Sequence, residues 1–70
     1  MKIILTNHAK QRMIERNIHI EEIKDTLEFP DYTITKENKI EAYKKMEGKN
    51  LKVVYTARDK FIKIITIILK

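Results

Sequence analysis

The sequence contains no cysteine and no tryptophan, and it has only one glycine and one proline among its 70 residues. Without cysteine there is neither a disulfide framework nor a thiolate metal site. The two histidines, His8 and His19, are too few to bind zinc without a cluster of carboxylates. We therefore expect no metal and no cofactor. No apolar run is long enough for a signal sequence or a membrane span, and the sequence predicts a soluble, cytoplasmic protein.

The length and the charge narrow the class of protein further. Seventy residues can build one hydrophobic core, so we expect a single domain over residues 1–70. Fifteen Lys and Arg against ten Asp and Glu give a formal net charge of +5. A field of this sign favours phosphate backbones or an acidic protein partner. Surface lysines and glutamates that only solvate and pair produce a similar composition, so charge alone favours a polyanionic partner only slightly.

The hydrophobic periodicity predicts an α+β fold, in which a short N-terminal strand and two helices precede an antiparallel sheet of three to four strands. The first strand is expected over residues 2–5. Thr6 or Asn7 can cap a helix that runs to about Arg16, and Asn17 suits the left-handed position at its C-terminal end. The first third of the chain therefore predicts a strand followed by a capped helix.

A second helix is expected after His19, because Glu22 stands at the capping-box position and apolar residues follow at helical spacing. Phe29 and Pro30 end it. From there the period changes toward two, and we expect strands over residues 32–36, 39–46, 51–56 and 61–69. Short turns connect them, which predicts an antiparallel meander.

A cationic stripe is expected on the first helix, where His8, Arg12 and Arg16 follow one another at intervals of four residues. Such a stripe lies at the edge of the packed face and keeps its guanidinium groups available for phosphate or carboxylate. From the residues alone, a solvated helix surface is the simpler interpretation, in which the arginines pair with Glu15 or with carboxylates of the second helix. Both interpretations stay open.

A second cluster is expected on the strands, where Tyr43 and Lys45 alternate with apolar residues and so point the same way. Arg58, in the last turn, adds positive charge. Cleavage of RNA without a metal needs a base for the 2′-hydroxyl and cations for the transition state, which a phenol beside ammonium groups suits. On spacing alone, a strand-favouring tyrosine packed under a helix is the simpler interpretation.

The last strand is predicted to be apolar on both faces. Strict alternation places Ile62, Ile64 and Ile68 on one face, with Ile65 and Ile67 on the other. Two helices can cover only one face of a small sheet. An interface with a partner helix, or with a second copy in a homodimer, is therefore expected at Ile62, Ile64 and Ile68.

The segments described so far also resemble a known group of proteins. They are His-Ala-x-x-Arg-Met-x-x-Arg-x-Ile at 8–18, the helix that ends in Phe-Pro-Asp at 29–31, Ala-Tyr-Lys-Lys at 42–45, Leu-Lys-Val-Val-Tyr at 51–55 and Ile-Ile-Thr-Ile at 64–67. This pattern is similar to a family of small uncharacterised prokaryotic proteins usually grouped with the RelE/ParE toxin superfamily. The resemblance implies a RelE-like domain, an acidic antitoxin as partner, and cleavage of messenger RNA, free or on the ribosome.

Three functions follow from these observations. The leading hypothesis is a toxin-like RNA-binding protein of a toxin-antitoxin pair, which as a metal-independent endoribonuclease would use His8 or Tyr43 for proton transfer. Its phosphate-binding residues would be Arg12, Arg16, Lys45 and Arg58, and it requires the helix stripe and the strand cluster to share one cationic pocket. The alternative is a non-catalytic interaction or dimerisation module that uses the last strand. A DNA-binding domain ranks third, because the second helix is acidic.

Overall fold

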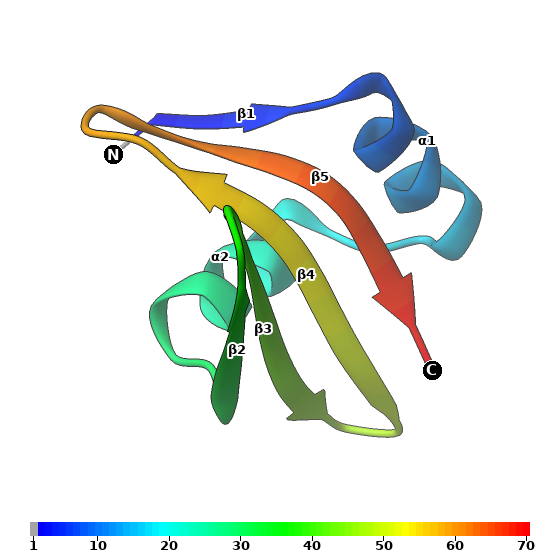
Figure 1. Cartoon of the computed structure of the whole chain (residues 1–70). Coiled ribbons are helices and arrows are strands. Elements are labelled where there is room, and N and C mark those ends of the chain that lie inside the picture. The colour runs from blue at the N-terminus through cyan, green and yellow to red at the C-terminus, as the bar shows by residue number, and fades with distance from the viewer. Residues whose placement is uncertain (1) are drawn as a thin grey trace.

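The architecture is a mixed five-stranded sheet with two helices, seen in a computed structural model that describes residues 2–70 (Figure 1). In chain order the elements are β1 (Lys2–Leu5), α1 (Asn7–Arg16), α2 (Ile20–Glu28), β2 (Tyr32–Lys36), β3 (Lys39–Met46), β4 (Lys49–Ala57) and β5 (Phe61–Leu69). The strand order is β1-β5-β4-β3-β2. The α+β class and the order of elements are confirmed. Neither helix in this part of the chain is long and apolar enough to cross a membrane.

The helix ends form where the sequence places capping residues. The Thr6 hydroxyl accepts the N–H of Ala9 at 3.1 Å, which satisfies one of the free donors at the start of α1. Asn17 closes the same helix in the left-handed conformation, with φ of 54°. At the start of α2, the Glu22 carboxylate accepts the N–H of His19 at 2.9 Å. Local side-chain chemistry therefore sets both helix starts and the turn between them.

Both helices pack on the same face of the sheet, which we call the helix face. Helix α1 lies against β5 and β1, and α2 lies against β4 and β3 (Figure 1). The core between helices and sheet consists of Ala9, Ile18, Ile23, Leu51, Val53, Ile64 and Ile67, all of which are buried. The other face, which we call the open face, carries neither of the two helices. A sheet with one covered and one open face is typical of antiparallel α+β domains.

A β-bulge on β5 decides which of its residues reach the core. Val54 pairs with Thr66, but the next residue, Tyr55, pairs with Ile64, so Ile65 is an extra residue in the ladder. The carbonyl of Ile65 accepts the Thr6 hydroxyl at 2.9 Å, which ties the bulge to the start of α1. The extra residue reverses the alternation along the strand. Ile64 and Ile67 can therefore both face the helices.

The prediction that Ile62, Ile64 and Ile68 share an outward face is wrong. Ile64 has no exposed surface, and Ile62 is partly buried against the same core. Ile68 lies beyond the bulge, opposite Lys52 on the open face, and is 37% exposed. Because strict alternation ignores the bulge, it assigned core residues to the surface. The expected apolar interface is not present on β5 in this form.

Candidate functional site

A row of three side chains crosses β2, β3 and β4 on the open face. The strand registers place Tyr32 opposite Tyr43, and Tyr43 opposite Lys52. The two phenol rings stack, with their centroids 4.6 Å apart and their planes 12° apart. On the other side of Tyr43, the Lys52 ammonium lies 5.4 Å from the ring centroid, within cation–π range. We call these three residues the Tyr-Tyr-Lys row.

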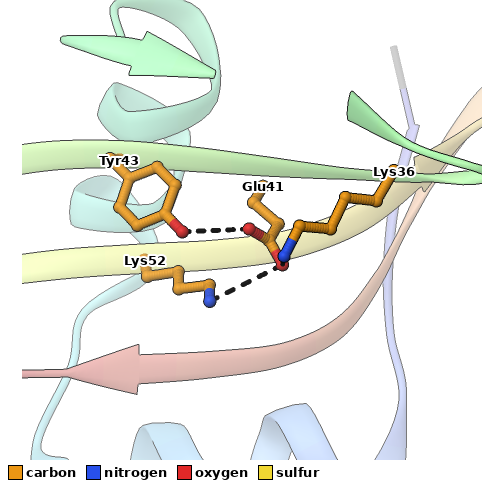
Figure 2. A network of polar contacts seen from close by, with 4 residues as sticks. All are labelled: Lys36, Glu41, Tyr43 and Lys52. Carbon is orange, nitrogen blue, oxygen red and sulfur yellow. Dashed lines mark hydrogen bonds and ion pairs between the residues drawn. The ribbon is translucent and has the colours of Figure 1, made fainter. Parts of the chain in front are cut away.

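Glu41 connects this row to a further lysine, as Figure 2 shows. The Tyr43 hydroxyl donates to Glu41 Oε1 at 2.9 Å. The other carboxylate oxygen lies 3.6 Å from Lys52 Nζ and 3.8 Å from Lys36 Nζ. Only 12% of the Glu41 side chain is exposed, so these neighbours hold it close to the sheet. The carboxylate therefore fixes the orientation of the phenol and gathers two ammonium groups around it.

The electrostatic environment keeps these groups in their charged forms. The hydrogen bond from Tyr43 lowers the pKa of Glu41, and the nearby charges of Lys36 and Lys52 lower it further, while desolvation opposes them. The pKa of Lys52 is raised, first by its interaction with the Tyr43 phenol and also by Glu41, with desolvation again opposing. At neutral pH the open face therefore presents one anion surrounded by cations.

Glu41 is the single acidic residue in the five strands, so the open face has an excess of positive charge. The registers and the alternation along each strand place lysines from four strands on the open face, namely Lys36 from β2, Lys39 and Lys45 from β3, Lys52 from β4 and Lys63 from β5. Acidic side chains are concentrated on α2 instead. The fold thus separates a cationic sheet face from an acidic helix.

A shallow hollow lies at one end of the row. It measures about 280 Å³ and is bordered by Asp31, Tyr32, Tyr43, Lys45 and Asn50, among others, and the Asp31 carboxylate accepts the N–H of Lys45 at 2.7 Å. An aromatic wall beside an ammonium and an amide can receive a planar, polar ring. Across residues 2–70, no three His, Asp or Glu side chains gather as in a metal site.

The prediction of one cationic pocket shared by His8, Arg12, Arg16, Tyr43 and Lys45 is wrong. Tyr43 and Lys45 do lie on the same side of β3, opposite Lys52 and Asn50 of β4. Helix α1, however, packs on the helix face over β5 and β1. The sheet therefore stands between the helix stripe and the strand cluster, and no single phosphate can contact both.

Arg58 lies apart from either cluster. It belongs to the turn between β4 and β5, where its N–H donates to the carbonyl of Phe61. Tyr43 pairs with Lys52, six residues before Arg58, which corresponds to about 20 Å along an extended strand. The exposed Arg58 side chain is thus at the tip of a hairpin, remote from the Tyr-Tyr-Lys row.

The sequence interpretation missed Tyr32, Lys36, Glu41 and Lys52 as site residues. A signal was present, because Tyr32 and Lys36 alternate in phase on their strand, as do Glu41 and Tyr43 on the next. Joining them required the register of two hairpins. The same alternation also indicates that Tyr43 points away from the helices, since its neighbour Ala42 is fully buried under them.

The model of a family described as Domain of unknown function (DUF4258) matches residues 5–69 of the chain. No curated protein and no solved structure matches it.

Proposed function

The chain belongs to the family described as a domain of unknown function, DUF4258, and we propose that it binds single-stranded RNA on its open face. The Tyr-Tyr-Lys row is the observation that carries this proposal. Proteins that bind single strands combine aromatic rings, on which bases stack, with cations that follow the phosphate backbone. Tyr32, Tyr43 and Lys52 supply both groups within one row.

The geometry of the row suggests how a strand would lie on it. Tyr32 is 56% exposed and stands on β2, the edge strand, so the side of its ring away from Tyr43 has no neighbouring strand. A base stacked there would extend the existing pair of rings. The phosphates on either side of that base would then reach Lys36 and Lys45. Glu41 supports the arrangement by orienting Tyr43.

The proposal concerns binding and does not include cleavage by His8 together with Tyr43. General acid–base catalysis needs both groups within hydrogen-bond reach of the same reacting unit. The two residues lie on opposite sides of the sheet. The Tyr43 hydroxyl, moreover, already donates to Glu41.

We also propose that the chain is related to the RelE/ParE toxin superfamily, as the resemblance of its segments implies, and that an acidic antitoxin is its partner. An acidic protein segment would compete with RNA for the same lysines of the open face. The toxin role is tested by inducible expression in a bacterium. The wild type is compared with a variant in which Tyr32 and Lys52 are replaced. Growth that continues unchanged with intact, folded protein would remove that role and leave RNA binding to be judged separately.

RNA binding itself is tested by fluorescence anisotropy with a labelled single-stranded RNA of about twelve nucleotides. The informative variant combines Lys36→Gln with Lys45→Gln. Its matched control, Lys24→Gln with Lys60→Gln, removes the same charge from exposed positions outside the open face. If the two lysines contact phosphates, the log–log salt slope becomes shallower by about 1.4 in the first variant and stays unchanged in the control. Equal losses in both variants would mean that net charge, not this face, drives binding.

A further inference from the structure

The stripe of His8, Arg12 and Arg16 on α1 has no role at the open face, because the sheet separates the two. Successive members of this stripe are four residues apart and therefore rise about 6 Å along the helix axis. His8 and Arg16 are exposed, and Arg12 is partly exposed. The stripe thus forms a linear row of one imidazole and two guanidinium groups, at intervals that the successive phosphates of a polynucleotide can follow.

The arginines of the stripe are weakly neutralised. Arg12 Nη1 lies 3.9 Å from Glu15 Oε1, at the limit of an ion pair, and both side chains are more than one-third exposed. Such a pair contributes little. The other oxygen of that carboxylate accepts a hydrogen bond from Gln11 Nε2 at 3.2 Å. Within residues 2–70, neither His8 nor Arg16 has a carboxylate within ion-pair distance. An incoming anion would have little to displace.

The stripe and the open face are electrostatically separate. The smallest dimension of the molecule is 20 Å, measured on Cα atoms. The Debye length is about 8 Å at physiological ionic strength, so charges on the two faces barely influence each other through solvent. A short oligonucleotide bound on the open face cannot also contact α1 through the sheet.

We propose that the α1 stripe is a second polyanion site, which binds the phosphate backbone of another RNA segment, so that one copy of the protein bridges two segments. The proposal rests on the function proposed for the open face, which supplies the first segment. The stripe carries two guanidinium groups and one imidazole, with no tyrosine, phenylalanine or tryptophan, so its contacts are chiefly with phosphate. The neighbouring helix repels a backbone through its carboxylates, Glu21, Glu22, Asp25 and Glu28. This charge contrast directs the second segment along α1.

Bridging is tested with two short oligouridylates of about six nucleotides, one carrying a donor dye and the other an acceptor. The full chain is mixed with both, energy transfer is measured, and native mass spectrometry counts the strands per protein. We expect wild type to bind two strands and to give energy transfer. Arg12→Gln with Arg16→Gln should bind one strand, lose energy transfer, and keep its open-face affinity within about twofold.

The matched control, Lys10→Gln with Lys24→Gln, removes two positive charges outside both sites and should behave as wild type. One strand per wild-type protein at saturation would overturn the proposal, as would energy transfer that survives in the arginine variant. Self-association is the other outcome to detect, since α1 of one copy can attract the acidic α2 of another. Sedimentation without RNA would then show salt-sensitive oligomers, which also overturns the proposal. If Tyr32→Ala binds RNA with the same affinity as wild type, the function proposed for the open face fails.

Discussion

Replacing Tyr32 by alanine removes the outer ring of the Tyr-Tyr-Lys row. This residue lies on the edge strand and is 56% exposed, so its loss takes little from the core. A base stacked on an aromatic side chain is worth about 1–3 kcal/mol, which corresponds to a loss of affinity of about 5- to 140-fold. The loss should be similar for different RNA sequences, because every base has a face that can stack.

Anisotropy titrations with single-stranded RNA measure this effect, and far-UV circular dichroism with thermal melting shows whether the fold is kept. Phe29→Ala is the matched control, because it removes another exposed aromatic ring, 66% exposed, from the end of α2. The control should bind as wild type. If Tyr32→Ala binds RNA within twofold of wild type while remaining folded, bases do not stack on this ring, and the proposed binding mode is incorrect.

Three further predictions concern the core, acid stability and the anion of the open face. Ile64→Ala should lower the free energy of unfolding by about 2–5 kcal/mol, whereas Ile68→Ala should lower it by about 1 kcal/mol or less, and urea denaturation that ranks them the other way would contradict the bulge. The hydrogen bond from the His19 N–H, and then Lys49, lower the pKa of Glu22 below its ordinary 4.5. Its contribution to stability is therefore present above that value and lost as pH falls through the lowered pKa, so Glu22→Gln should flatten the decline seen in wild type in acid-range denaturation curves. Glutamine at position 41 removes the negative charge and can still accept the Tyr43 hydroxyl. Glu41→Gln should therefore strengthen RNA binding and steepen the salt slope by about 0.7 if one more phosphate is contacted, and weaker binding by a folded variant would show that the charged carboxylate is needed for the site.

The order and approximate bounds of the elements could be predicted because their signals are local. Thr6 and Asn17 delimit the first helix, and Glu22 marks the start of the second. The position of β1 beside β5 could not be predicted in the same way, since a parallel pairing between the two ends of the chain leaves no local pattern. The bulge at Ile65 likewise has no local sequence signal, yet it determines which isoleucines of β5 are buried.

The candidate site was predicted only in part, for a related reason. Tyr43 and Lys45 were identified from alternation along one strand, which is a local property. Their partners Tyr32 and Lys52 come from neighbouring strands, and finding them requires the hairpin registers. The turn between β2 and β3 has Glu37 at φ of 51° and no glycine, so it lacks the usual sequence signal that fixes such a register.

The open face as an RNA-binding surface is tested most directly by titrating the isotopically labelled protein with single-stranded RNA and following its amide resonances by NMR. We predict that the largest changes fall on β2, β3 and β4, centred on Tyr32, Tyr43 and Lys52. If a complex forms while the resonances of these three amides do not shift, RNA does not bind on the open face.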